Sequence, residues 1–120
     1  VTFISLGQRR YLSVLKHADM IVGNSSSGII EAPSFGIPTV NIGDRQRGRV
    51  MPESVLNCPP EKDRIIEAIK EGYSFECREK CKNVVNPYGT GNTAKKIFCI
   101  LQEKIRNDVN LKKKFYDLMY

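Results

Sequence analysis

The stretch MIVGNSSSGIIEAPSFGIPTVNI, residues 20–42, decides the fold. Residues 20–23 are a short, continuously apolar run, typical of a central strand that is covered on both faces of a parallel sheet. A polar turn follows at 24–28, then a helical pattern over 29–35, and then a second apolar strand over 39–42. A strand, a helix and another strand in this order predict a parallel α/β sheet.

Proline and glycine residues define the predicted helix over 29–35. Gly36 directly follows it, and Pro38 prevents any continuation. Pro33 inside the segment removes one backbone hydrogen bond and is expected to bend it. A short helix of about two turns is therefore expected.

The same alternation of strands and helices continues on both sides of this stretch. The further elements are expected as strands over 1–5 and 54–57 and as helices over 8–18, 60–72, 75–83, 93–106 and 111–120. Ile65, Ile66 and Ile69 are expected to face inward. The fold class predicted is α/β, a Rossmann-like parallel sheet with flanking helices.

The length and the first residues bound the domain organisation. A chain of 120 residues is one domain by size and can bury an ordinary core. Residues 1–5 begin directly as a strand pattern, so we expect a piece of a larger protein. No run has the roughly 20 apolar residues of a membrane span and none resembles a signal peptide, so a cytoplasmic protein with no membrane partner is expected.

The formal net charge of +6 raises the possibility of a nucleic-acid partner. Much of the excess lies on the predicted last helices, at Lys95, Lys96, Lys104, Arg106 and 112–114. Charge on such helices is typical of a solvated face, and no aromatic residues alternate with basic ones to stack bases. No nucleic-acid partner is therefore predicted.

The cysteines and the single histidine offer no metal site or hydrolase site. Cys58, Cys77, Cys81 and Cys99 have no CxxC spacing, so we expect no metal and buried or idle thiols. His17 stands near Asp19, but the Gly-x-Ser-x-Gly elbow of a serine hydrolase is absent. His17 is interpreted as a surface or helix-end residue.

The serine turn is the strongest candidate site. Ser25, Ser26, Ser27 and Gly28 lie between a predicted strand and a helix start, where free N–H groups and the helix dipole favour an anion. The serines add hydroxyl donors, and glycine allows close approach of a ligand to the backbone. One serine would suffice to cap a helix, so three indicate a diphosphate site.

Acidic and basic residues stand close to this turn. Glu31 is placed to accept hydrogen bonds from the two hydroxyls of a ribose, or simply to stabilise the first helical turn. Arg45, Arg47 and Arg49 follow the next strand and could clamp a phosphate or be solvated charge.

The run GNSSSGIIEAPSFGIPTVNIGDRQRGR at 23–49 and the later NPYGTGN at 86–92 resemble the UDP-N-acetylglucosamine 2-epimerase family. The resemblance covers nearly the whole chain and is closest to the hydrolysing branch, which releases N-acetylmannosamine for sialic-acid synthesis. It implies the carboxyl-terminal half of a two-domain glycosyltransferase B type fold, which binds UDP or UDP-N-acetylglucosamine.

The resemblance also implies roles for single residues. Ser25 and Ser26, with Ser27 and Gly28 close by, would hold the diphosphate, as would Arg45; Glu31 would take the ribose; Leu6 and Tyr11 would flank the uracil. In the family UDP leaves by anti-elimination across C1–C2 of the sugar, giving a 2-acetamidoglucal, to which water adds in the hydrolysing branch. The acid, base and histidine belong to an amino-terminal part, so no catalytic residue and no cofactor is expected here.

The resemblance further implies partners for the chain. The final helices, about 93–120, would pack back toward the amino-terminal domain, and the full-length enzyme would be a homo-oligomer. Ile97, Ile100, Leu101 and Ile105 give one of these helices an apolar face that the separate chain would expose. Three alternatives stay open: a glycosyltransferase B type sugar transferase, a reversible UDP-N-acetylglucosamine/UDP-N-acetylmannosamine epimerase, and a non-enzymatic nucleotide-sugar sensor.

Overall fold

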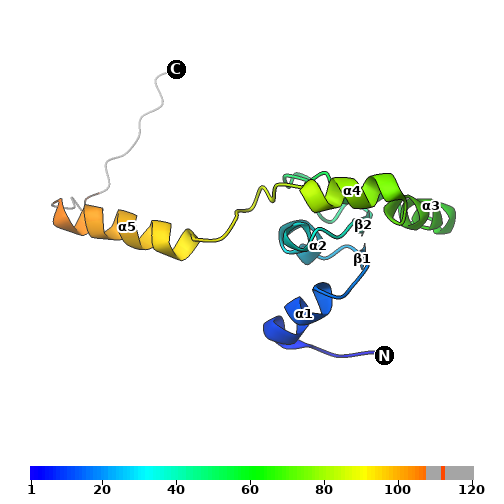
Figure 1. The fold of residues 1–120 in the computed structure, drawn as a ribbon, viewed down its shortest axis with the longest axis horizontal. Helices are drawn as coiled ribbons and strands as arrows, with labels where there is room; N and C mark the ends of the chain where they lie inside the picture. The colour runs from blue at the N-terminus through cyan, green and yellow to red at the C-terminus, as the bar shows by residue number, and fades with distance from the viewer. Residues whose placement is uncertain (108–111, 113–120) are drawn as a thin grey trace, which may run out of the picture. The chain divides into compact units, whose positions relative to one another are not determined.

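The computed structural model describes residues 1–107 and 112, and it divides the chain into two compact units, Val1–Thr90 and Gly91–Tyr120. The boundary falls within the predicted turn cluster at 86–92. Figure 1 shows the elements in chain order. They are α1 (Gly7–Leu15), β1 (Ile21–Gly23), α2 (Ser27–Ile30), the 3-10 helix η1 (Ala32–Phe35), β2 (Thr39–Ile42), β3 (Val55–Cys58), α3 (Lys62–Gly72), α4 (Phe75–Asn83) and α5 (Thr93–Arg106).

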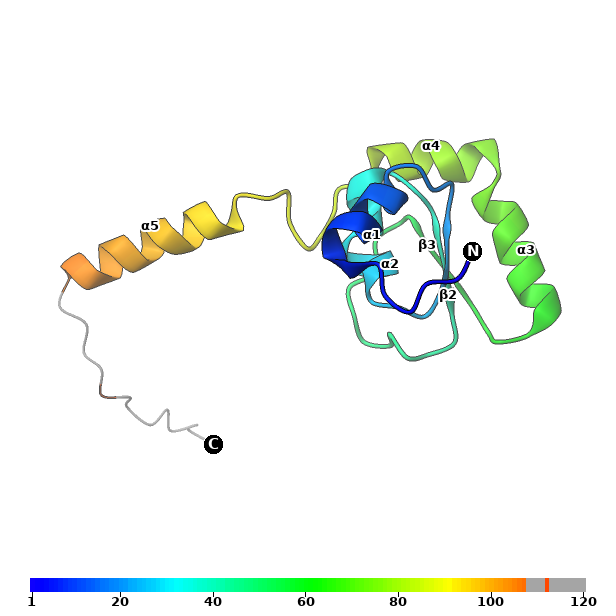
Figure 2. The same ribbon diagram turned by 90° about the horizontal axis from the view of Figure 1, so that it is seen from below.

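The first unit is built on a parallel sheet with the strand order β1-β2-β3. Thr39 of β2 stands beside Ile21 on one side and Val55 on the other. Figure 2 shows α1 and α2 on one side of the strands and α3 on the other. The predicted parallel α/β sheet with flanking helices is confirmed.

The main apolar core lies between the sheet and α3. Val40, Cys58 and Ala68 are buried at its centre. Successive residues of β2 alternate between the two faces, so Thr39 lies opposite Val40, toward α2. The half-buried residues around this core are Met20, Ile42, Leu56, Ile65 and Ile69.

Two predictions about the start of the sheet are wrong. Residues 1–5 form no strand, because a strand needs ladder hydrogen bonds from a neighbour and none pairs with them in the described chain. β1 is consequently an edge strand and not the predicted central one. Its Val22 is 47% exposed, so it is not covered on both faces.

The break between α2 and η1 follows from Pro33, as predicted. The α-helix ends at Ile30 and the chain continues as a 3-10 turn in which Pro33 lies near the start. Gly36 then adopts a left-handed conformation with a φ of 65° and ends the segment. The helix thus begins earlier than the predicted residue 29 and is shorter.

Helix α3 differs from the prediction at one inward position. Ala68 and Gly72 are buried and Ile65 and Ile69 are half-buried, a spacing of three and four residues along one face. Ile66 falls outside this face because it directly follows Ile65 on the helix, and it is 39% exposed.

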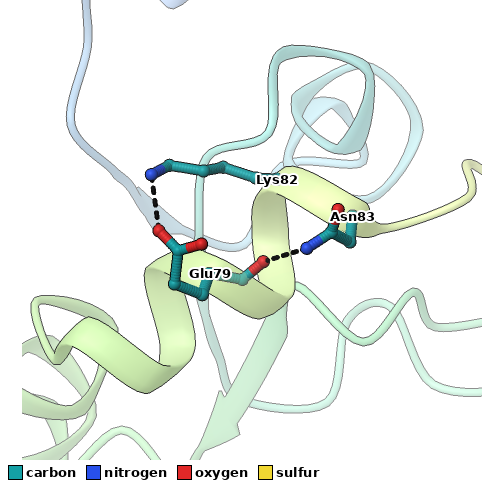
Figure 3. A network of polar contacts seen from close by, with 3 residues as sticks. All are labelled: Glu79, Lys82 and Asn83. Carbon is teal, nitrogen blue, oxygen red and sulfur yellow. Dashed lines mark hydrogen bonds and ion pairs between the residues drawn. The ribbon is translucent and has the colours of Figure 1, made fainter.

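Helix α4 occupies the predicted residues 75–83. Its start is capped by Ser74 Oγ, which accepts a hydrogen bond from the Cys77 N–H at 3.2 Å. In its last turn, Lys82 Nζ pairs with Glu79 Oε1 at 2.6 Å and Asn83 Nδ2 donates to the Glu79 carbonyl at 3.0 Å (Figure 3). Both contacts lie within the last two turns of the helix and reinforce its end.

The second unit contains α5, which spans the predicted residues 93–106. It buries no residue among those that the structure describes. The apolar side chains expected on it are exposed, as are its lysines and arginine. The helix predicted over 111–120 lies outside the described residues except for Lys112.

Candidate functional site

The serine turn connects the end of β1 to α2, as the sequence predicted. Ser25 Oγ accepts a hydrogen bond from the Ser27 N–H at 3.3 Å, and the Ser25 carbonyl accepts one from Gly28 at 3.2 Å. Ser26 stands at the N-cap position, but its side chain makes no capping bond. The turn therefore holds itself through Ser25 and leaves the Ser26 hydroxyl for another partner.

Tyr11 of α1 reaches this turn directly. Its hydroxyl forms a short hydrogen bond with Ser27 Oγ, across two elements that the sequence separates by 16 residues. The contact fixes the side chain of Ser27 from outside the turn. Tyr11 was predicted to lie beside a uracil, and the structure adds a contact that sequence reasoning did not anticipate.

Glu31 lies where α2 ends and η1 begins. Its Oε2 atom is buried and has no hydrogen-bond partner in the described part of the chain. A carboxylate oxygen removed from water is costly unless a donor reaches it. The arrangement therefore suits a ligand that brings hydroxyl donors, such as the two hydroxyls of a ribose.

An open pocket of about 680 Å³ gathers most of the predicted site residues. Its walls come from residues 3–8 together with the side chains that the sequence analysis singled out. The predicted residues that line it are Leu6, Tyr11, Ser25, Ser27 and Glu31. Ser26, Gly28 and Arg45 do not line it.

Gly28 is in tight contact with the sheet. It is buried, and a Cβ atom at this position would overlap the Thr39 methyl group of β2. Thr39 Oγ1 donates to the Gly28 carbonyl at 2.8 Å, which holds the two elements in close contact. The glycine thus sets how closely the serine turn approaches the sheet.

The arginine loop, residues 43–49, follows β2 and approaches the serine turn from the neighbouring strand. Arg45 Nη1 lies 3.5 Å from Asn24 Oδ1, at the outer limit of a hydrogen bond. Arg45, Arg47 and Arg49 are all exposed. Gln46 between them is buried and donates from Nε2 to the Asn24 carbonyl at 2.7 Å.

Two residues of the NPYGTGN segment, 86–92, make hydrogen bonds to the elements around the serine turn. Asn86 Nδ2 donates to the Ile30 carbonyl at 2.8 Å and to Ser34 Oγ at 2.7 Å, on either side of the break at Pro33. Tyr88 Oη donates to the Val50 carbonyl at 2.9 Å, just beyond the arginine loop. The segment thereby connects the helix that carries Glu31 with that loop. The sequence alone shows this segment as part of the family resemblance and assigns its residues no contact.

Within the first unit, neither the cysteines nor His17 lines the open pocket. Cys58, Cys77 and Cys81 are buried and Cys99 is exposed. Burial, with a smaller contribution from the nearby Cys77, raises the pKa of the Cys81 thiol to about 12. The described residues contain no group of three or more His, Cys, Asp and Glu side chains placed to hold a metal ion. His17 is exposed just after α1.

The helices in the described residues are all too short or too polar to cross a membrane.

Comparisons with known proteins agree on one family. A family model described as UDP-N-acetylglucosamine 2-epimerase matches residues 1–102. The polysialic acid biosynthesis protein P7 of Escherichia coli is 36% identical over 115 residues, which is 96% of this chain and 29% of that protein. The UDP-N-acetylglucosamine 2-epimerase of Neisseria meningitidis serogroup B is 31% identical over 118 residues, 98% of this chain and 31% of that protein.

A third relative carries a different name. The GDP/UDP-N,N'-diacetylbacillosamine 2-epimerase (hydrolyzing) of Campylobacter jejuni is 39% identical over 116 residues, 97% of this chain and 30% of that protein. The chain therefore spans about 30% of the length of these curated relatives.

Proposed function

Since the chain belongs to the UDP-N-acetylglucosamine 2-epimerase family, we propose that it is the UDP-binding, carboxyl-terminal part of a hydrolysing 2-epimerase with a glycosyltransferase B type fold. The pocket beside the serine turn carries this proposal. It brings Glu31 Oε2, a buried carboxylate oxygen with no partner among the described residues, together with serine hydroxyls beside it and with the hydroxyl of Tyr11 from α1. That combination of donors and one acceptor suits a nucleoside diphosphate.

The proposed pose places the ligand along the pocket from α1 to the serine turn. The diphosphate rests on the hydroxyls of residues 25–27 and on the N–H groups of Ser25 and Ser26, with Arg45 reaching it from the next loop. The ribose hydroxyls donate to Glu31, and the uracil lies by Leu6 and Tyr11. The N–H groups of Ser25 and Ser26 support this pose, because in the described chain they donate to no protein acceptor.

The chemical role proposed for this part is to stabilise departing UDP. Elimination across C1–C2 of the sugar leaves negative charge on the diphosphate while a 2-acetamidoglucal forms. Hydroxyl, N–H and guanidinium donors fixed in place lower the free energy of that charge as it grows. The acid and base that move protons on the sugar are proposed to lie in the amino-terminal part, so this chain alone turns over nothing.

The hydrolysing branch is supported by two of the relatives. Those from Campylobacter jejuni and Legionella pneumophila both carry the word hydrolyzing in their names. In the proposed reaction water adds to the glucal and N-acetylmannosamine is released with UDP. Assembly as a homo-oligomer and packing of residues 93–106 against the amino-terminal part belong to the same proposal.

A second substrate is a candidate because of one observation. The Campylobacter jejuni relative, named for a diacetylbacillosamine nucleotide, is 39% identical to this chain. The proposed site binds the nucleotide, and the sugar is proposed to be contacted by the remainder of the enzyme. Incubating the longer enzyme with UDP-N-acetylglucosamine and with UDP-N,N'-diacetylbacillosamine identifies the substrate. Each incubation is repeated with an acceptor sugar, and a product that forms only with the acceptor would indicate a transferase.

The nucleotide site is tested by removing two serine hydroxyls. The double variant Ser25→Ala, Ser26→Ala should bind UDP roughly tenfold more weakly, because charge-assisted hydrogen bonds to phosphate are lost. The matched control is Ser13→Ala, whose exposed hydroxyl bonds only within α1 and should leave affinity unchanged. Calorimetric titration of the chain with UDP measures both; equal affinity in all three proteins would place the ligand elsewhere.

The absence of turnover is tested separately. The purified 120-residue chain is incubated with UDP-N-acetylglucosamine and the products are analysed by chromatography. No N-acetylmannosamine is expected above the rate without protein. Its release by this chain would contradict the assignment of the proton-transferring groups to the amino-terminal part.

A further inference from the structure

Gln46 is the buried residue of an otherwise exposed arginine loop. It is 4% exposed, whereas Arg45 and Arg47 on either side of it are exposed. The loop turns around it, because the Arg47 N–H bonds to the Asp44 carbonyl at 2.8 Å and the Arg49 N–H to the Gln46 carbonyl at 3.3 Å. These turns direct the glutamine inward and the arginines outward.

The side chain of Gln46 joins two loops that follow neighbouring strands. Its Nε2 donates to the backbone carbonyl of Asn24 at 2.7 Å. Asn24 is the first residue after β1 and directly precedes Ser25. Gln46 lies in the loop after β2 and directly follows Arg45. The bond therefore fixes the backbone of the serine turn relative to the arginine loop.

Other links between the two loops are weaker. Arg45 Nη1 lies 3.5 Å from Asn24 Oδ1, and both side chains are exposed, so this contact is long and open to water. Arg45 is thus free to turn toward an anion while its backbone stays in place. Gln46 therefore holds the backbone of the loop in place, and Arg45 provides the positive charge for an anion.

The two polar atoms of the Gln46 amide differ in their hydrogen bonding. Its Oε1 atom is buried and has no hydrogen-bond partner in the described part of the chain. An apolar side chain of similar shape would remove this unmet acceptor, but it would also leave the Asn24 carbonyl without the donor that Gln46 Nε2 supplies. The distinctive contribution of the glutamine is therefore its hydrogen bond to the Asn24 carbonyl.

We propose that Gln46 is a positioning residue of the diphosphate site, which holds the serine turn and Arg45 at the separation that lets both contact one pyrophosphate group. This inference rests on the proposed nucleotide site. Gln46 itself touches no ligand atom in this arrangement. It acts through the backbone of Asn24 on one side and through Arg45 on the other.

The test compares ligands with and without the diphosphate. Gln46→Met keeps the length of the side chain and removes the N–H donor. Gln46→Glu keeps the shape of the side chain but replaces the N–H donor with a carboxylate oxygen, which only accepts. Each variant of the chain is titrated by NMR with UDP and with uridine. Gln102→Met makes the matched change at an exposed glutamine of α5. We expect both Gln46 variants to bind UDP about fivefold more weakly and uridine unchanged.

A double-mutant cycle with Arg45→Ala separates positioning from general stability. Because Gln46 acts partly through Arg45, the loss caused by Gln46→Met should be smaller in the Arg45→Ala background than in the wild-type chain. Additive losses, or equal losses of UDP and uridine affinity, would overturn the inference. An unchanged UDP affinity of Gln46→Met would also overturn it. If the Ser25→Ala, Ser26→Ala variant still bound UDP more weakly than the wild-type chain, the proposed nucleotide site would remain valid without the role of Gln46. A wild-type chain that binds no UDP would reject both proposals.

Discussion

Helices α3 and α5 share an amphipathic sequence pattern but differ in burial. α3 buries Ala68 and Gly72 against the sheet, whereas α5 buries no residue among those the structure describes. No side chain of α5 makes a hydrogen bond or ion pair within the described chain either. An amphipathic pattern thus predicts that one face must be covered, but it does not say by what.

The reason for the difference lies in what each helix meets along the chain. α3 follows β3 directly, so the apolar face of the sheet is within reach of a short connection. α5 carries five exposed large apolar residues in a unit of its own. These residues are Ile97, Phe98, Ile100, Leu101 and Ile105. Their proposed cover is the amino-terminal part of the enzyme.

The largest expected effect separates the two units by thiol reactivity. Cys99 on α5 is exposed, while Cys81 in the first unit is fully buried and its pKa is raised to about 12 by burial. Only the thiolate reacts, and a buried thiol reacts only after opening. With an opening free energy of about 5 kcal/mol, Cys81 should react with iodoacetamide at least roughly a thousandfold more slowly than Cys99 near pH 8.

Mass spectrometry after timed pulses of iodoacetamide measures both rates. In concentrated urea the two cysteines should react at similar rates, which controls for intrinsic reactivity. Native rates within tenfold of each other would mean that the first unit is no better packed than α5.

A smaller effect is expected from the same substitution placed in each unit. Ile29 is fully buried between α2 and the sheet, and Ile97 on α5 is 51% exposed. Ile29→Ala should lower the free energy of unfolding by about 2–5 kcal/mol through lost burial and a cavity. Ile97→Ala should change it by less than about 0.5 kcal/mol. Urea unfolding followed by circular dichroism measures both, and equal losses would contradict the difference in packing.

Two glycines of the first unit refine the comparison further. A methyl group at Gly28 would meet the Thr39 methyl, whose side chain is held by its hydrogen bond to the Gly28 carbonyl. At Gly72 it would meet the terminal methyl of Met20, which can move. Gly28→Ala should therefore cost about 1–3 kcal/mol and Gly72→Ala less than about 1 kcal/mol. Thermal unfolding measures both, and a larger loss at Gly72 would show that the rigidity of the neighbour does not decide the cost.

The strand-turn-helix unit was predictable because its signals are local. The apolar runs gave β2 and β3, Pro33 gave the break after α2, and the serine cluster gave the turn. α4 and α5 matched their predicted bounds because a cap, a glycine or a turn cluster stands at their ends. Each of these features depends on residues close in the chain.

Features that depend on distant partners were not predictable. Residues 1–5 have the composition of a strand, but no strand of the described residues pairs with them, and β1 lies at the edge of the described sheet. Gln46 is buried within a polar loop because it meets the carbonyl of Asn24, 22 residues away. At the candidate site, residue types indicated Glu31 and the serines. The bond between Tyr11 and Ser27 required the tertiary fold to bring α1 beside the turn.

The smallest expected effect tests whether the first unit orders its polar side chains as well as its apolar ones. Tyr11→Phe removes the hydroxyl that bonds to Ser27 and leaves the ring in place. The loss of one part-buried hydrogen bond should lower the free energy of unfolding by about 1 kcal/mol and weaken UDP binding about threefold. The control is Tyr73→Phe, since that ring is 53% exposed and lies 5.1 Å from the Arg78 guanidinium, a contact that phenylalanine retains. If the two variants unfold and bind UDP alike, Tyr11 contributes only its ring, and the Ser27 hydroxyl is oriented by the ligand and not by the fold.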